Sequence, residues 1–307
     1  MFILHPDPYC LPSYRIGPFT TKDLSINRNL KCNDKIDHYL NERFGNQDYI
    51  YTKNGRQALC LALDSLNLKK DDIVTVLTTS GNLYISGCVT SEIEKFCRWN
   101  REISPQTKAI LLNHEFGFPY EEVEKLKALG LPIIEDCAHT FFSKGVEVNP
   151  GSIGDFVVYS FPKMFPLQIG GLLVCSHFMQ ISKKNVIEDA LLQHIKSVLS
   201  TYIENKNEII EKRLSNYNYL KSRLLELGFS PRFQMKKGTV PGVFMFKTEG
   251  HSIDLPELKN HFYAHGVQCS VFYGEEAFFI PVHQALVQDD LDYFVAILKA
   301  YLQRGSQ

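Results

Sequence analysis

The chain has 307 residues, of which 22% are charged and 44% are hydrophobic, and its formal net charge is -1. This length suits one large domain or two unequal domains. The near-neutral balance, with basic residues scattered along the chain, argues against nucleic acid and against an anionic membrane surface as partners. The eight cysteines form no CxxC pair and no zinc-type spacing with histidine, so we expect reduced thiols and no metal site.

The N-terminal stretch lacks the basic start and apolar core of a signal peptide, and no apolar run approaches membrane-spanning length. These features predict a cytoplasmic protein. Residues 1–30 are rich in Pro, Asn and Tyr, which indicates an irregular arm. Apolar residues at helical spacing predict the first helix over residues 33–44.

The next part of the chain alternates helices with short apolar strands. A helix is expected over residues 56–68, with Asn54 and Gly55 at its N-terminus, and a second over 119–130. Apolar runs predict strands at 71–77, 107–116, 131–136, 155–161 and 170–176. This alternation indicates an α/β fold with a mostly parallel central sheet covered on both faces.

The character of the sequence changes after residue 182. A long charged helical region without proline or glycine runs to residue 226, and an α+β pattern follows. Its strands are expected at 242–248 and 267–273 and its helices at 255–266 and 289–302. We therefore predict a large α/β domain with an N-terminal arm over 1–180, and a long connecting helix with a small C-terminal α+β domain over 181–307.

Lys163 stands out in the stretch YSFPKMFPLQIGG, because it is the only acidic or basic side chain between Asp155 and Lys183. A desolvated lysine has a lowered pKa, and its neutral amine is a nucleophile toward carbonyl groups. The plainer interpretation is a lysine that reaches out of a surface loop into solvent.

Other polar residues fall at strand ends, where ligands bind in open α/β sheets. Residues 54–56 open a helix whose free amides and arginine could hold an anion, Asp136 ends one strand, and Ser160 and Lys163 end another. An anion site, a carboxylate and an isolated lysine are the three needs of pyridoxal 5'-phosphate (PLP). No glycine-rich motif supports binding of a dinucleotide or a nucleoside triphosphate. An α/β protein that binds some other phosphate ligand is therefore the least favoured hypothesis.

The sequence resembles the DegT/DnrJ-type sugar aminotransferases, which have the fold type I architecture of PLP-dependent enzymes. The resemblance covers about half of the chain. It is carried by the segments KNGRQALCLALDSLNLKKDDIV, TKAILLNHEFGFP, LPIIEDCAHTFFSKG, GSIGDFVVYSFPKMFPLQIGG and FIPVHQALVQDDLDYFV.

The resemblance implies roles for individual residues. Lys163 matches the lysine that binds the cofactor covalently, Asp136 matches the partner of the pyridinium nitrogen, and His139 matches the residue beside the pyridine ring. Three further matches would bind the cofactor phosphate: Gly55, Arg56 and Ser160. The family also implies a homodimer.

Some features depart from the family pattern. Lys163 follows Ser160 by three residues instead of five, and no NYRM-like segment from a neighbouring subunit is found. The aromatic residue that stacks on the cofactor falls near Asn82, for which Tyr84 could substitute. His114 is interpreted either as a substrate contact or as a structural histidine.

Two further residues have plainer interpretations. We favour packing or capping over chemistry for His283. Cys137 is expected to point into the core, because alternate residues of a strand face opposite sides.

The leading hypothesis is an aminotransferase that moves an amino group from an amino acid such as glutamate to a nucleotide-linked keto sugar. Two alternatives stay open: a PLP-dependent sugar dehydratase or lyase, and a catalytically silent protein of the same fold that serves as a binding partner. Members of the family that dehydrate sugars tend to replace the lysine with histidine, so Lys163 favours transamination.

Overall fold

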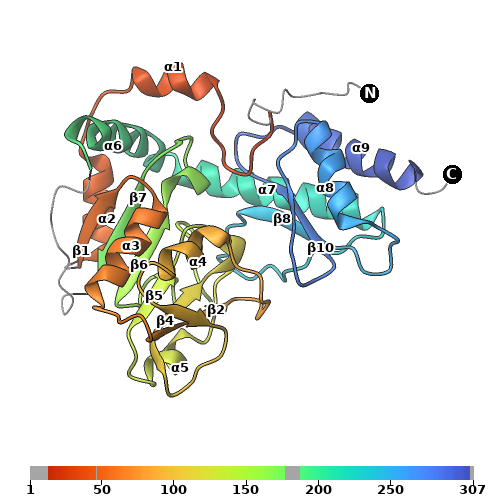
Figure 1. Ribbon diagram of the computed structural model, residues 1–307. Coiled ribbons are helices and arrows are strands. Elements are labelled where there is room, and N and C mark those ends of the chain that lie inside the picture. Colours follow the sequence, from red (N-terminus) through yellow and green to blue (C-terminus); the bar gives the residue numbers. More distant parts are fainter. Residues whose placement is uncertain (1–12, 46, 177–186, 305–307) are drawn as a thin grey trace.

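The computed structural model describes residues 13–45, 47–176 and 187–304. Within these residues the chain forms a seven-stranded sheet of order β1-β7-β6-β5-β4-β2-β3 and a three-stranded sheet of order β8-β10-β9 (Figure 1). The strands are β1 (Asp48–Thr52), β2 (Ile73–Thr78), β3 (Arg98–Asn100), β4 (Thr107–Asn113), β5 (Ile133–Asp136), β6 (Phe156–Ser160), β7 (Gly171–Cys175), β8 (Val243–Lys247), β9 (Ser270–Val271) and β10 (Ala277–Pro281). The predicted α/β class, with a mostly parallel main sheet and a smaller C-terminal α+β unit, is confirmed.

The large sheet is parallel except for β7, which runs against both of its neighbours, β1 and β6. Strands β1, β4, β5 and β6 therefore end at the same edge of the sheet, and β7 begins there. The register pairs Asn113 with Asp136, and Gly171 with both Thr52 and Ser160. Strand order thus gathers chain segments that are far apart in sequence at one edge.

Helices cover both faces of the large sheet, as the buried strands require. The helices are α1 (Lys22–Arg28), α2 (Lys35–Phe44), α3 (Gly55–Ser65), α4 (Gly87–Ile93), α5 (Val123–Lys127), α6 (Asp189–Ile203), α7 (Lys206–Leu225), α8 (Leu255–Ala264) and α9 (Gln288–Arg304). Helices α3 and α4 pack on Phe156 and Val158 of β6, whereas α2 and α6 pack on Val157 and Tyr159 of the same strand. Alternate residues of one strand therefore belong to two separate cores.

Helix α7 joins the two units (Figure 1). Its first turn contributes Ile209 to the core beneath the large sheet, and further along Tyr217 and Leu220 belong to the core of the C-terminal unit. In that unit α8 and α9 pack together and against the small sheet. The small sheet is therefore held beside the edge of the large sheet by a helix that is anchored in both cores.

Several expectations need correction. The arm contains the short helix α1, and strands β1, β3 and β10 and helix α4 were not predicted. The helical region expected over 183–226 is two helices that meet at residues 204–205, and residues 183–186 of it lie outside the described residues. Strand β4 ends at Asn113 because a 3-10 turn with Phe116 at φ 52° follows. The predicted domain boundary at residue 180 falls in 177–186, which the structure does not describe.

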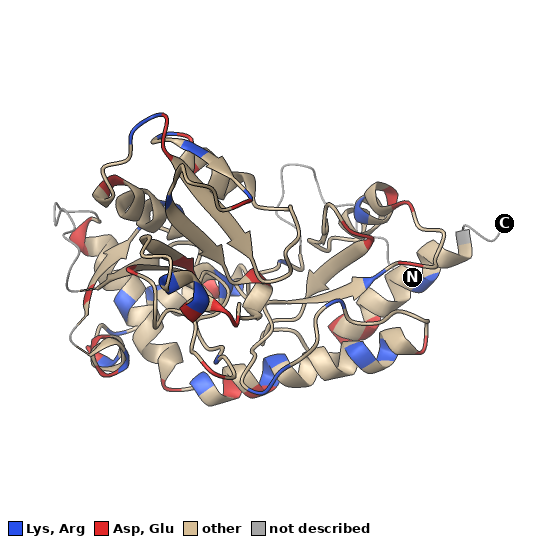
Figure 2. Ribbon diagram, turned by 90° about the horizontal axis from the view of Figure 1, so that it is seen from below, with Lys and Arg blue, Asp and Glu red and all other residues tan. Residues whose placement is uncertain are grey.

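Charge is mixed over the helices. Figure 2 shows lysine, arginine, aspartate and glutamate interspersed along the helices of the face seen from below, as the scattered basic residues of the sequence predicted. Among the described helices, none combines the length and apolar character that a membrane crossing needs.

Candidate active site

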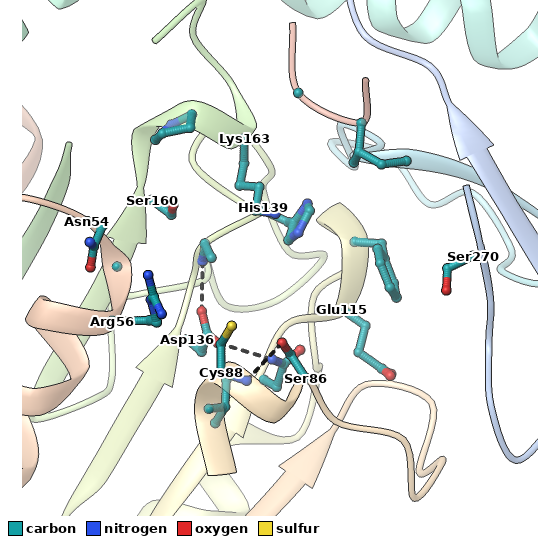
Figure 3. A pocket seen from close by; sticks show the side chains of 18 of the residues that line it. Asn54, Arg56, Ser86, Cys88, Glu115, Asp136, His139, Ser160, Lys163 and Ser270 are labelled. Atoms are coloured by element: carbon teal, nitrogen blue, oxygen red, sulfur yellow. Dashed lines mark hydrogen bonds between the residues drawn. The ribbon is translucent and has the colours of Figure 1, made fainter. Parts of the chain in front are cut away.

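A cavity of about 600 Å³ opens at the edge where the strands of the large sheet end. Its walls come from the large sheet, from the N-terminal arm and from the segment that leads into β9. The cavity brings together all the residues predicted to bind the cofactor: Gly55, Arg56, Asp136, His139, Ser160 and Lys163. In Figure 3, Asn54, Arg56 and Ser160 lie at one end and Glu115 and Ser270 at the other, with Asp136, His139 and Lys163 between them.

The first end of the cavity is the N-terminus of α3. Asn54 caps the helix by accepting a hydrogen bond from the amide of Gln57 (3.0 Å), and the exposed Arg56 follows in the first turn. A Cβ on Gly55 would lie only 3.2 Å from the Cβ of Ser160. Glycine therefore keeps this corner open, with helix amides, a hydroxyl and a guanidinium around it, which suits a phosphate.

Close packing explains why Gly170 and Gly171, which follow the lysine loop, are glycines. A Cβ on Gly171 would lie 2.6 Å from the carbonyl carbon of Asn54, and the amide of Gly170 donates to the carbonyl of Lys53 (2.6 Å). Only a residue without a side chain lets the start of β7 approach the turn before α3 so closely. The pair thereby holds the anion end against the loop that carries Lys163.

Asp136 lies at the end of β5 with 9% of its surface exposed. Its Oδ1 accepts from the amide of Ala138 (3.0 Å) and its Oδ2 from Nδ2 of Asn113 (3.1 Å), as the dashed lines in Figure 3 show. Burial raises the pKa of this carboxyl, and the amide of Ala138 and the nearby Lys163 oppose that shift. The group is thus a buried carboxyl, aimed into the cavity, that a positive charge would favour in its ionised form.

Lys163 is half-buried in the cavity wall, in a short 3-10 turn directly after β6. Burial lowers the pKa of its amine, and the carboxylate of Asp136 opposes that shift. A lowered pKa increases the fraction of the neutral, nucleophilic form. The shortened spacing from Ser160 does not displace either residue, since both line the cavity.

The main chain of the lysine turn is held by residues from the C-terminal half of the protein. The fully buried Arg213 of α7 donates from Nη2 to the carbonyl of Lys163 (2.8 Å), from Nη1 to the carbonyl of Pro241 (3.1 Å) and from Nε to Gln284 Oε1 (2.8 Å). Gln284 in turn donates to the carbonyl of Met164 (2.8 Å). Burial lowers the pKa of Arg213 to about 9. No described carboxylate forms an ion pair with it, so its hydrogen bonds replace solvation.

His139 is set against the Phe116 ring, with 5.5 Å between ring centroids. Burial lowers its pKa well below the ordinary value, and the positive charges of Lys163 and Arg213 lower it further. The imidazole is therefore neutral. Its Nδ1 is buried, faces Gly242 and has no partner among the described residues, while the residue itself lines the cavity.

His114 does not line the cavity, so the interpretation as a substrate contact needs correction. It is 1% exposed; its Nδ1 accepts from the amide of Tyr120 (3.0 Å), and its Nε2 therefore carries the proton and donates to Glu135 Oε2 (2.8 Å). Glu135 also accepts from three amides of the following loop, at residues 151, 153 and 154. This saturated pair is structural, which was the other interpretation of His114.

His114, Glu135 and Cys137 are also the group of metal-ligand types that the described residues bring together. The oxygens of Glu135 are already occupied by its hydrogen bonds, and Cys137 points into the core beneath the sheet, as predicted. Burial raises the pKa of the Cys137 thiol well above its ordinary value, so the thiolate form that binds metals is disfavoured.

Some cavity residues were not singled out from the sequence. Arg15 of the arm lines the cavity, although its segment shows no periodicity that would have identified it. Glu115 lies within the quoted motif NHEFGFP but was passed over; burial raises its pKa, and its Oε2 accepts from the amide of Ser80 (2.6 Å). Tyr84, the suggested substitute for the stacking aromatic, does line the cavity.

Part of the chain matches a known protein family. Residues 95–187 match the model of the DegT/DnrJ/EryC1/StrS aminotransferase family. GDP-perosamine synthase of Escherichia coli O157:H7 is 29% identical over 167 residues, which cover 44% of this chain and 46% of that protein. The match thus spans less than half the length of this curated relative.

Solved structures share the fold over nearly the whole chain. The aminotransferase TlmJ from Streptoalloteichus hindustanus has a TM-score of 0.72 at 16% identity, covering 93% of this chain and 95% of that one. An E. coli GDP-4-keto-6-deoxy-D-mannose-3-dehydratase with bound hydrated PLP has a TM-score of 0.67 at 13% identity. The match covers 94% of this chain and 100% of the dehydratase chain. The resemblance to the DegT/DnrJ-type family and the fold type I architecture expected from the sequence are confirmed.

Proposed function

We propose that this chain is a PLP-dependent aminotransferase that takes an amino group from an amino acid such as glutamate and delivers it to a nucleotide-linked keto sugar. The observation that carries the proposal is the placement of Lys163. Its amine is half-buried and has a lowered pKa, in a cavity that also holds the buried carboxyl of Asp136 and the anion corner at Gly55 and Ser160. The family match supports the same reaction class.

The residues present fit the cofactor. Gly55, Arg56 and Ser160 would bind its phosphate in the corner that a Cβ on Gly55 would narrow, Asp136 would keep its ring nitrogen protonated, and His139 would lie beside the ring. When bound, PLP supplies an electron sink for the carbon that carries the amino group. Burial raises the pKa of Asp136, and a cation beside the carboxylate would oppose that shift.

The chain itself supplies the proton chemistry. Lys163 lines the cavity, and its lowered pKa lets the neutral amine attack a carbonyl or accept a proton. Arg213 and Gln284 hold the two carbonyls of its turn, so the amine is presented from a fixed backbone. His139, kept neutral by burial, does not compete as a cation for the negative groups of the ligand.

A sugar dehydratase is the second candidate, because an E. coli dehydratase has the same fold. The presence of a lysine at 163, where dehydrating members of the family tend to carry histidine, favours transamination. A catalytically silent protein is disfavoured by the grouping of all the predicted cofactor residues around one cavity.

The test is an absorption spectrum of the purified protein with added PLP, followed by borohydride trapping and peptide mapping. We expect a visible band from lysine-bound cofactor, with the trapped adduct on the peptide that contains Lys163. Glutamate should bleach the band and a keto acid should restore it. A protein with no band, or with the adduct on another lysine, would refute the proposal, and a band that sugar bleaches without net amino transfer would indicate the dehydratase.

Assembly and location are further parts of the proposal. The family implies a homodimer, which sedimentation of the purified protein would reveal as a species of twice the chain mass. A cytoplasmic location follows from the sequence expectations alone, and fractionation of cells that express the protein would test it.

A further inference from the structure

The end of the cavity away from α3 carries donors that the cofactor would not use. Arg15 of the N-terminal arm lines it, together with Gln268, which precedes β9, and Ser270, the first residue of β9. Figure 3 shows Ser270 on the opposite side of Lys163 from Asn54 and Arg56. This end is therefore where a substrate would lie if the proposed function holds.

The arm is fixed at this point by main-chain contacts. Gln268 donates its amide to the carbonyl of Tyr14 (2.7 Å), and its Oε1 accepts from the amide of Ile16 (2.8 Å). The carbonyl of Arg15 accepts from Nε2 of His283 (3.0 Å). The backbone on both sides of Arg15 is thus held by the C-terminal unit, and Nε2 of Gln268 has no acceptor among the described residues, so it can donate to a ligand.

Arg15 lines the same cavity as the reactive amine of Lys163. A Cβ on Gly17 would lie 2.5 Å from the carbonyl of Pro162, so the arm touches the lysine turn directly. The positive charge of Arg15 contributes to lowering the pKa of Lys163, after burial. Its guanidinium lies over the Phe19 ring, 5.8 Å from the centroid, and forms no ion pair with any residue that the structure describes.

We propose that Arg15, assisted by Gln268, binds the α-carboxylate of the amino donor. A guanidinium presents a planar fork that matches a carboxylate. The α-carboxylate is attached to the carbon that bears the reacting amine, so it must lie near Lys163. In a nucleotide-linked sugar, by contrast, the sugar ring separates the diphosphate from the keto carbon. The position of Arg15 in the same cavity as Lys163, on an arm that contacts the lysine turn, therefore favours the carboxylate over the diphosphate.

The carboxyl group of Glu115 also lies at this end of the cavity, but it has partners of its own within the protein. Burial raises the pKa of Glu115, the amide of Ser80 and the charges of Arg232 and Arg101 oppose that shift, and its Oε2 is already bonded to Ser80. The charge of Glu115 is thus balanced by groups of the protein. Among the described residues, no carboxylate balances the charge of Arg15 in the same way.

The test uses the full-length holoprotein after borohydride reduction, which blocks Lys163 and prevents turnover. Calorimetric titration with glutarate, a dicarboxylate without an amine, and with inorganic pyrophosphate compares wild type, Arg15→Gln, Arg15→Lys and the control Lys22→Gln. Lys22 lies on the same arm but is exposed and outside the cavity. We expect Arg15→Gln to weaken glutarate binding about tenfold or more, Arg15→Lys to weaken it less, and Lys22→Gln to leave it unchanged.

A second measurement follows the glutamate half-reaction of the unreduced holoprotein. The glutamate concentration that gives half-maximal bleaching should rise in Arg15→Gln by the same factor. Unchanged glutarate binding in Arg15→Gln would overturn the inference, and so would a loss confined to pyrophosphate, which would assign Arg15 to the sugar nucleotide. Failure to trap Lys163 in the wild type would refute the proposed function itself, so the two failures are distinguishable.

Discussion

The two ends of the cavity are built in different ways. The end at α3 comes from neighbouring strand termini of one sheet, where β1, β5 and β6 end and β7 begins. The far end joins the arm at Arg15 to the segment at Gln268, which lies more than two hundred residues later in the chain. The first is set by the order of strands in one sheet, and the second by docking of the arm on the C-terminal unit.

This difference teaches where each kind of function is placed. Under the proposed function, cofactor chemistry would take place at the end that is set by buried strands and close glycine packing. Substrate selection would fall to the end where a short arm and a small sheet meet, because such a junction can change without disturbing the large core.

The largest effect that would test this division is expected from Lys163→Met. The variant lacks the only amine that the proposal uses, so amino transfer should fall by at least about a hundredfold. Steady-state assays measure the loss of amino transfer, and borohydride trapping measures the loss of the cofactor adduct at residue 163. Lys144→Met, a change of a lysine outside the cavity, is the control. If the Lys163→Met variant is still trapped, at another lysine, the cofactor does not bind to Lys163 and the proposed division between a cofactor end and a substrate end is wrong.

The next effect concerns the residue that ties the cofactor end to the C-terminal unit. Arg213→Met leaves the carbonyls of Lys163 and Pro241 and the Gln284 oxygen without their donor, so the free energy of unfolding should fall by about 1–3 kcal/mol. The trapping rate at Lys163 should fall as well.

Arg223→Met on the same helix is the matched control, since Arg223 only forms ion pairs near the surface, which contribute about 0–1 kcal/mol. Urea denaturation compares the variants. A stabilised Arg213→Met protein that is trapped at the normal rate would show that the arginine does not position the lysine turn.

A smaller effect is expected from Ser160→Ala. The hydroxyl lies beside the helix N-terminus at Gly55, and loss of one hydrogen bond to a phosphate should weaken PLP binding about tenfold. Titration of the apoprotein with PLP measures this, with the exposed Ser152→Ala as control. Equal affinity in both variants would remove Ser160 from the cofactor end.

The smallest effect is a pH dependence of the apoprotein. The pKa of Lys163 is lowered in the folded state, mainly by burial, so the cost of burying its charge is fully present below that lowered pKa. As pH rises from there toward the unfolded value of 10.5, the unfolded state binds more protons and folding becomes more favourable. Lys163→Met removes this cost.

The variant should therefore be more stable than wild type at low and neutral pH, and the difference should shrink as pH approaches 10.5. Denaturation at a series of pH values measures it. A stability difference that grows with pH would contradict the lowered pKa of the amine.

Much of the cofactor end could be predicted from sequence. Asp136 ends an apolar strand, and Lys163 is isolated among uncharged residues, so short-range pattern and family motifs identified both. The same motifs included His114, but only the structure distinguishes its buried pair with Glu135 from a substrate contact. Strands β1, β3 and β10 escaped because their hydrogen bonds to neighbouring strands, not their own periodicity, define them.

The amino-acid sequence by itself determined the alternation of strands and helices, the isolation of the lysine and the glycines that later allow close approach, because these depend on neighbouring residues. Only the tertiary structure decided that Arg213 supports the lysine turn and that Arg15 lies at the far end of the cavity. Their partners are distant in the chain, and no local pattern records which buried donor meets which carbonyl once the two units have packed.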